Sequence, residues 1–451
     1  MKPWIALAAA ALAMTAGPAR ADPSPVAQEY PPPKRPVPDY GGRRPPPNSA
    51  RDITLWVPRV ILSPLYFTSE YVIRAPLSVV IPAAERAELP RRVRDFFFFG
   101  PQHKAGIIPV GYADFGFNPS VGVYGFWNDA FAKDNDWTLH TEAWPANWYA
   151  LSVKERARLD KQRVVQFQVT GTHRPDRVFY GTGSQTLQSS QSRFTEAVAD
   201  ESVMLDWKYL RESRLQLTVG LRSESLGPGH YGHDPSLQQE AATGAFAVPY
   251  GFDGRYTAEY NRVVVSVDSR RPAPAPGSGA RVEAKAEQGS NMLGSPASGW
   301  IRYGATAAGF LDLDQHQHLV SLSLSTAFAD PLGSLPIPFT ELVALGGDGP
   351  MFGYLPRRML GRSAAVAALR YVWPVAPSLG GTIEVALGNV FDEHLQGFRP
   401  DLLRFSGDVG LTTIGVSDYP IEAIVGIGSE TFEHGGQIDS IRVKLSMNHG
   451  F

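Results

Sequence analysis

The sequence predicts an all-β protein: a 16-stranded antiparallel transmembrane β-barrel preceded by short N-terminal periplasmic helices. Three observations predict it: an export signal, period-two alternation along most of the chain, and few charged residues. Charged residues make up 19% of the 451 residues, less than in a typical soluble domain. A net charge of −2 excludes the basic field of a nucleic-acid binder. The lack of cysteine excludes disulfides, thiolate catalysis and cysteine-ligated metals.

Residues 1–21 have the three parts of a secretory signal peptide. Lys2 gives a positive start, Ile5–Met14 is apolar, and Ala19-Arg-Ala21 is a small-x-small cleavage site. The apolar stretch is too short to cross roughly 30 Å of hydrocarbon. We therefore expect cleavage after Ala21 and export of the remainder.

The next two segments precede the predicted barrel. Residues 22–50 are a proline-rich linker, with ten prolines between positions 23 and 49, because proline favours extended, solvated backbone. Residues 51–104 are predicted to form short helices that cover or plug the barrel on its periplasmic side. At the end of this block, Phe96-Phe-Phe-Phe99 follows several arginines. This sequence fits either a membrane interface or the solvated end of a helix followed by a buried turn.

From residue 105 to residue 451 the dominant pattern is alternation of apolar and polar residues, which places each set on one face of a strand. We predict sixteen strands, an even number as closure of an antiparallel barrel requires. Their expected ranges are 106–116, 119–129, 137–148, 149–158, 162–173, 192–209, 212–225, 253–270, 278–291, 299–312, 316–328, 362–375, 380–391, 402–416, 420–431 and 437–451.

A soluble sandwich could also produce such alternation, but three features favour the barrel. The polar faces carry several charges in one strand, as in Arg281, Glu283, Lys285 and Glu287, which a wet lumen permits. Many segments exceed the length of about 9–11 residues that crosses hydrocarbon. Aromatic residues also gather near strand ends, as in the girdles of membrane barrels; they are Trp144, Trp148, Tyr149, Trp207, Tyr209, Trp300, Tyr303, Tyr371 and Trp373.

The end of the chain resembles the C-terminal recognition signal of bacterial outer-membrane barrels. Leu445 and Met447 continue the alternation of the last strand, and Phe451 is a terminal aromatic residue. We therefore expect Leu445, Met447 and Phe451 to form a barrel signal.

Several motifs together resemble the BamA/TamA (bacterial surface antigen) family of outer-membrane barrels. Phe179-Tyr-Gly-Thr-Gly-Ser184 is similar to its Phe-Tyr-Gly-x-Gly-Asn segment, and Val267-Asp-Ser-Arg270 with Gly279-Ala-Arg281 is similar to a hairpin motif. The stretch from Gly346 to Tyr354, with Gly361-Arg-Ser363 and Leu369–Pro374, resembles the family's sixth loop and the strand after it. Gly388-Asn-Val-Phe391 and Gly407-Asp-Val-Gly-Leu411 resemble its last strands.

The resemblance implies that the sixth loop folds into the lumen, where a loop arginine pairs with a strand aspartate. It marks Gly353, Tyr354, Arg357 and Arg358 as lumen-loop residues. At the two paired positions the sequence departs from the family, with Phe352 in place of the arginine and Ala386 in place of the aspartate. Arg357, Arg358 or Arg362 could instead pair with an acid such as Asp408.

Members of the family that insert or secrete proteins carry POTRA modules before the barrel, and no such pattern is visible in the sequence. The chain therefore resembles a POTRA-less branch. The resemblance implies an integral outer-membrane protein, its N-terminus in the periplasm, that acts in assembly or translocation of outer-membrane protein or lipid. Expected partners are outer-membrane lipid and an unfolded barrel or exported protein. In this family the seam between the first and last strands is weak and can open sideways.

Two other functions stay open: a passive, porin-like solute channel and a lipolytic barrel. Known catalytic motifs are missing from the sequence, so we expect no enzyme activity and no cofactor. Two histidine pairs, His230 with His233 and His316 with His318, fit exposed loops better than a metal site.

Overall fold

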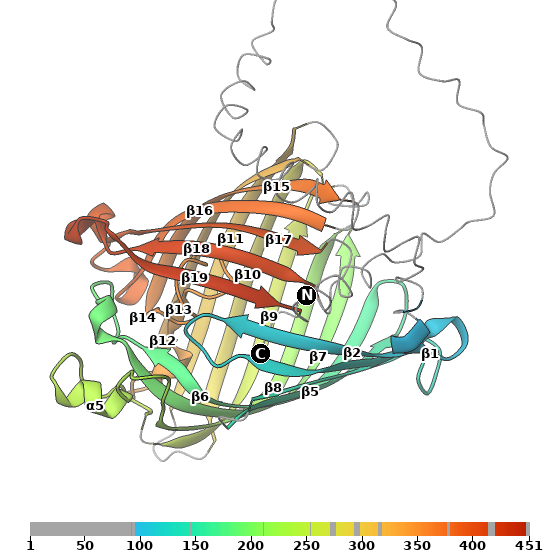
Figure 1. Ribbon diagram of the computed structural model, residues 1–451, viewed down its shortest axis with the longest axis horizontal. Helices are drawn as coiled ribbons and strands as arrows, with labels where there is room; N and C mark the ends of the chain where they lie inside the picture. The colour runs from blue at the N-terminus through green and yellow to red at the C-terminus, as the bar shows by residue number, and fades with distance from the viewer. Residues whose placement is uncertain are drawn as a thin grey trace, which may run out of the picture. The chain divides into compact units, whose positions relative to one another are not determined.

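The computed structural model describes Arg92 and residues 95–447, except for 145–146, 211, 253, 271–276, 293–297, 314–317, 377–378 and 414–419. The described residues form a 17-stranded sheet, in which sixteen antiparallel strands close into a barrel from β2 round to β19 (Figure 1). These strands are β2 (Ala105–Asp114), β3 (Ser120–Trp127), β4 (Asn135–Trp144), β5 (Trp148–Arg158), β6 (Arg163–Phe179), β7 (Ser192–Leu210), β8 (Ser213–Pro228), β9 (Arg255–Asp268), β10 (Gly279–Asn291), β11 (Gly299–Asp312), β12 (Leu319–Pro331), β15 (Ser363–Ala376), β16 (Leu379–Phe391), β17 (Arg404–Thr413), β18 (Glu422–Ser429) and β19 (Ile438–Ser446).

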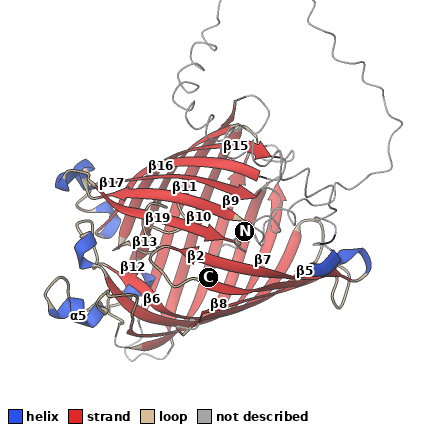
Figure 2. Cartoon of the chain, in the orientation of Figure 1, coloured by secondary structure: helices blue, strands red, loops and turns tan. Residues whose placement is uncertain are grey.

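The remaining elements are short and lie mostly at one end of the barrel (Figure 2). We call this the loop end and the opposite end, with its tight hairpins, the turn end. At the loop end, α5 (Leu237–Ala242) has a capping box between Ser236 and Gln239. No helix among the described residues is both long and apolar enough to span a bilayer. A two-residue strand, β1 (Phe98–Phe99), pairs with β2 at the turn end.

The two faces of the sheet differ as the alternation predicts. In β8, Leu217, Val219 and Leu221 point outward and are 40–54% exposed. In β19, Ile441 is 71% exposed, while its neighbour Arg442 is fully buried in the interior. An apolar exterior with a polar interior is the arrangement of a barrel that meets lipid, so the predicted 16-stranded antiparallel barrel is confirmed.

The barrel wall is uneven in height. β6, β7 and β8 contain 17, 19 and 16 residues, whereas β2, β3 and β4 contain 10, 8 and 10. The first strands of the barrel therefore form a low wall, and β5 separates it from the tall wall of β6, β7 and β8.

Some sequence expectations need correction. β6 runs on to Phe179 instead of ending at residue 173, because a register shift between Arg174 and Arg177 accommodates Pro175, which lacks a ladder donor. Trp148 and Trp300 do not join an outer girdle, since their positions point inward and they are only 2% and 1% exposed. Of the predicted helical block, residues 51–91 lie outside the described residues, and Phe98–Phe99 forms a strand.

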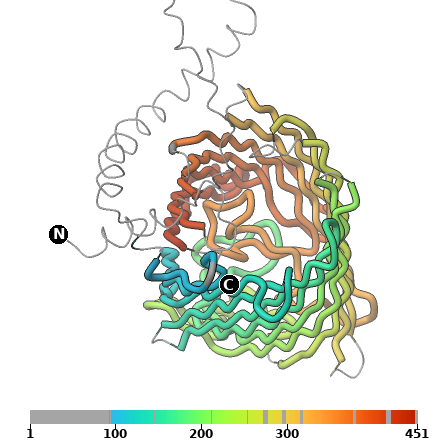
Figure 3. Tube along the Cα trace, turned by 90° about the vertical axis from the view of Figure 1, so that its right-hand side faces the viewer, coloured from blue at the N-terminus to red at the C-terminus, as the bar shows by residue number. Residues whose placement is uncertain are grey.

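The long connection between β12 and β15, residues 332–362, lies inside the ring of strands (Figure 3). We call it the long loop. It contains the 3-10 helix η4 (Phe339–Glu341) and a small hairpin of β13 (Val343–Leu345) and β14 (Met359–Gly361). Phe339 packs edge-on against Phe179 and Phe194, with ring centroids 5.3 Å apart in each pair. An aromatic cluster thus anchors the loop within the lumen.

Candidate functional site

The barrel closes at a short seam between its first and last strands. Within the described residues, which end at Met447, β2 and β19 share three residue pairs, Asp114–Lys444, Ala113–Leu445 and Tyr112–Ser446. Every other pair of neighbouring barrel strands in the described chain shares at least seven. Since ladder hydrogen bonds and cross-strand contacts hold a sheet together, this seam is the least paired junction of the ring among the described residues.

A buried ion pair crosses the seam. The Arg442 guanidinium of β19 donates to both carboxylate oxygens of Asp114 on β2, with Nε–Oδ1 at 3.0 Å and Nη2–Oδ2 at 2.7 Å. Both side chains are 0% exposed. The Tyr112 hydroxyl also donates a hydrogen bond to the Asp114 carboxylate, at 2.8 Å. Such a bidentate, charge-assisted contact is strong when both partners are present.

The same arginine also holds the tip of the long loop. Arg442 Nη1 donates to the carbonyl oxygen of Gly347 at 2.7 Å and lies within 3.4 Å of those of Phe352 and Tyr354. Its guanidinium lies 4.4 Å from the centroid of the Phe352 ring, in cation–π contact. Phe352, at the position where the BamA/TamA family that the sequence resembles has a loop arginine, therefore meets an arginine that the last strand supplies.

A second buried cation, two residues further along β19, also joins the last strand to the long loop. Lys444 of β19 is 1% exposed, and its Nζ lies 2.9 Å from both Asp348 of the long loop and Glu422 of β18. Arg442 and Lys444 together therefore connect the last strand with the loop, with β18 and with β2. We call Asp114, Arg442, Lys444 and Asp348 the seam latch.

The predicted loop residues Gly353 and Tyr354 pack on the inner face of β18. A Cβ at Gly353 would lie 1.9 Å from the Ile427 carbonyl oxygen, so only glycine fits this close approach. Gly428 leaves the space that the Tyr354 ring fills. The structure therefore brings these two residues together at β18, beside the latch.

The Tyr354 hydroxyl fixes the loop to two strands. It lies 2.7 Å from the carbonyl oxygens of Phe405 and Ser429 and accepts a hydrogen bond from the Ser429 N–H at 2.8 Å. Burial raises the pKa of Tyr354 to about 12, so the hydroxyl stays a neutral donor at physiological pH.

Replacing Tyr354 with phenylalanine is expected to loosen the loop by about 1–3 kcal/mol, because the buried Ser429 N–H loses its acceptor. Limited trypsin digestion measures this, since release of the loop exposes the bonds after Arg357 and Arg358. Tyr209→Phe is the matched control, because its hydroxyl bonds the Ser266 carbonyl at the turn end. Equal digestion of both variants would contradict a holding role for Tyr354.

The three loop arginines do not pair with Asp408. Arg357 reaches Glu196 at 3.3 Å, and Arg362 pairs with Asp330 and Glu393. Arg358 stacks on the Tyr180 ring and donates to the Thr186 hydroxyl and carbonyl oxygens. None of their described ion pairs involves Asp408, because register places that residue opposite Glu384 on the lumen wall.

The long loop has a further anchor that sequence reasoning missed. Glu341 in η4 lies 3.1 Å from Arg222 of β8 and 3.0 Å from Arg302 of β11. Here the loop supplies the acid and the wall supplies the arginines, the reverse of the ion pair that the resemblance implies. In the sequence, Glu341 stands before the apolar run Leu342-Val-Ala-Leu345, and nothing except its charge indicates that it anchors the loop.

The predicted C-terminal signal is described only in part. Leu445 points outward and is 51% exposed, and the Met447 N–H donates to the Gly111 carbonyl oxygen at 2.9 Å across the seam. Phe451 lies outside the described residues.

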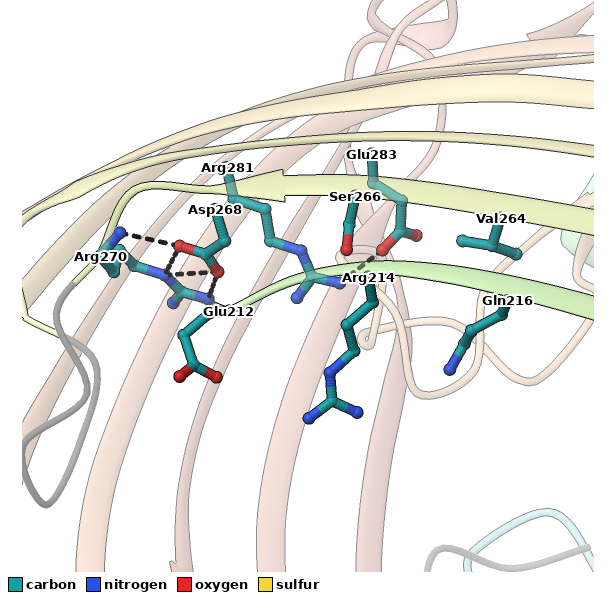
Figure 4. A pocket seen from close by; sticks show the side chains of 9 residues that line it. All are labelled: Glu212, Arg214, Gln216, Val264, Ser266, Asp268, Arg270, Arg281 and Glu283. Atoms are coloured by element: carbon teal, nitrogen blue, oxygen red, sulfur yellow. Dashed lines mark hydrogen bonds and ion pairs between the residues drawn. The ribbon is translucent and has the colours of Figure 1, made fainter. Parts of the chain in front are cut away.

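The lumen wall opposite the seam carries a polar pocket of about 290 Å³ near the turn end, where β8, β9 and β10 meet (Figure 4). Its arginines have acidic partners: Arg270 pairs with Asp268 at 2.6 Å and Arg281 with Glu283 at 2.5 Å. The pocket is therefore hydrophilic, and the positive charges of its arginines are balanced by acidic side chains. Within the described part of the chain, no group of three or more histidine, aspartate or glutamate side chains could hold a metal ion.

Comparison with known proteins finds similar solved structures but no similar sequence family. No family model matches the sequence, and no curated protein matches it. Among solved structures, BamA from Haemophilus ducreyi lacking POTRA domains 1–3 is similar with a TM-score of 0.53 and 11% identity, over 76% of this chain and 70% of that one. CdiB from Acinetobacter baumannii is similar with a TM-score of 0.47 and 11% identity, over 76% of this chain and 60% of that one.

Proposed function

We propose that this chain, which has the fold of BamA-type outer-membrane barrels, assists the insertion of other β-barrel proteins into the outer membrane by opening its seam. The single observation that carries the proposal is the three-pair closure between β2 and β19. A strand whose edge becomes free can pair with an incoming strand by β-augmentation. The proposal includes an N-terminus in the periplasm, so that the loop end faces outward.

The seam latch supports this function because the seam can open only when the contact between Asp114 and Arg442 breaks. Separating β2 from β19 removes Asp114 from Arg442, while Arg442 keeps the loop carbonyl oxygens of Gly347, Phe352 and Tyr354. Tyr354 and Gly353 bind the loop to β17, β18 and β19. We infer that the last three strands and the loop stay together and that the low wall starting with β2 moves away.

The test is a folding assay in vesicles of phosphatidylcholine and phosphatidylethanolamine that contain the purified protein. A small unfolded outer-membrane barrel protein is added, and its folding is followed by the gel shift of the unheated sample. Folding is expected to be faster than in protein-free vesicles. No acceleration would contradict the proposal.

A passive solute channel is the alternative, and the polar wall of Figure 4 is compatible with a wet lumen. The long loop lies across that lumen, anchored at Glu341 on one side and at Arg442 on the other. In planar bilayers the assembly function predicts small or absent currents. Large, steady single-channel currents without any effect on client folding would favour the channel instead.

A further inference from the structure

The residues just before the barrel fold back onto its first strand. Phe98 pairs with Gly106, and Phe99 pairs with Ala105. The opposite edge of β2 is already occupied, since β3 pairs with all residues from Ala105 to Tyr112. Because a strand has only two edges, β1 lies on the edge of β2 that faces the seam.

The backbone hydrogen bonds at the seam show which N–H and C=O groups of β2 point to this edge and can pair with another strand. The Phe115 N–H donates to the Val443 carbonyl oxygen at 3.0 Å, and the Met447 N–H donates to the Gly111 carbonyl oxygen at 2.9 Å. The backbone N–H and C=O groups of successive residues in a strand point to opposite edges. The backbone groups of residues 107 and 109 therefore point to the seam edge, as those of Gly111 and Phe115 do. Position 109 is proline, which has no N–H to donate. The described seam ladder can therefore not continue regularly past Gly111 toward the turn end.

An aromatic contact across β2 holds β1 in place. Gly106 has no side chain, and the Phe126 ring of β3 lies over it, 2.5 Å from where a Cβ would be. The Phe126 ring meets the Phe98 ring edge-on, with centroids 5.4 Å apart. Phe98 of β1, Gly106 of β2 and Phe126 of β3 thus form one layer over three strands.

We propose that β1 is an autoinhibitory strand that occupies the edge of β2 to which an incoming strand would add. Among the described residues, β1 and the seam leave only the backbone groups at Ile107 and the carbonyl oxygen of Pro109 without a strand partner on this edge of β2. With β1 removed, the free edge extends down to Ala105. This inference rests on the proposed function for its role in the cell, but the occupancy of the edge can be tested separately.

The test compares variants in which β1 is locked or loosened. In F99C/A105C, oxidation locks β1 onto β2, because the two residues face each other and the natural chain has no other cysteine. Phe98→Ala removes the ring contact without touching the barrel, and Gly106→Ala displaces Phe126. Gly171→Ala on β6 is the control glycine substitution, because nothing lies within 4 Å of its Cβ position and the residue is away from the seam.

The first readout is binding of a fluorescein-labelled peptide with the sequence of residues 438–447 to the full-length protein in detergent. Affinity is expected to rise about tenfold in Phe98→Ala and Gly106→Ala, to stay unchanged in Gly171→Ala, and to fall in oxidised F99C/A105C until reductant is added. Equal affinity in the locked and loosened forms would overturn the inference.

The second readout is the client-folding assay with the same variants. Loosened variants are expected to accelerate folding beyond the wild-type protein, and the locked form is expected to slow it. If peptide binding follows the state of β1 while no variant accelerates client folding, the autoinhibitory strand stands and the proposed function fails.

Discussion

Arg442→Met is expected to destabilise the closed barrel by about 3–5 kcal/mol, because removing one partner of a buried ion pair leaves the other charge buried alone. Asp114 is fully buried beside Tyr112 and cannot regain water without opening the seam. The loop loses its donor to Gly347 and its cation–π contact at Phe352 in the same variant. Urea unfolding in detergent, followed by tryptophan fluorescence, measures the change.

Two controls separate the latch from a general effect of charge removal. Arg281→Met breaks an ion pair whose side chains are 42% and 32% exposed, so its expected cost is below about 1 kcal/mol. The double variant Arg442→Met/Asp114→Leu removes both buried charges and is expected to recover most of the lost stability. If Arg442→Met and Arg281→Met cost the same, the latch does not hold the seam.

A disulfide across the seam is expected to reduce client folding to the rate of protein-free vesicles. Ala113 and Leu445 are direct partners on β2 and β19. Facing residues of antiparallel strands have Cα atoms about 4.5–5.5 Å apart, which a disulfide accepts. Oxidised A113C/L445C can no longer separate its first and last strands, and reductant is expected to restore activity.

The matched control uses the same cysteine on the other side of β19. Leu445 also faces Ala423 of β18, so A423C/L445C places a disulfide within the group of strands that is expected to move as a unit. This variant is expected to keep full activity when oxidised. Full activity of oxidised A113C/L445C would remove seam opening from the account.

The strands could be predicted from the sequence because their signal is local. In β19, Ile441, Val443 and Leu445 point outward while Arg442 and Lys444 are buried on the lumen side, and the alternation alone predicts this. The resemblance also predicted that Gly353 and Tyr354 lie in a lumen loop. Their packing on Gly428 agrees with that, since a glycine in a strand often marks a close approach.

The latch could not be predicted, because its partners are distant in the sequence. Arg442 and Asp114 are 328 positions apart, and nothing near Asp114 indicates which cation it meets. The departure at Phe352 indicates that the usual ion pair is lost, and the nearest candidates in the sequence are the arginines of the loop itself. The compensating arginine is on the last strand, where it looked like one more polar residue of the inner face. Only the closure of the ring brings these residues together.

Hydrogen exchange of the backbone amides in lipid tests most directly whether this seam opens. The Phe115 and Met447 N–H groups bridge the seam, while the ladder between β18 and β19 provides the comparison. We predict that the two seam amides exchange faster than the amides of that neighbouring ladder, and that Arg442→Met accelerates them further without affecting the ladder. Equal protection of both sets, in the wild-type protein and in the variant, would contradict the account.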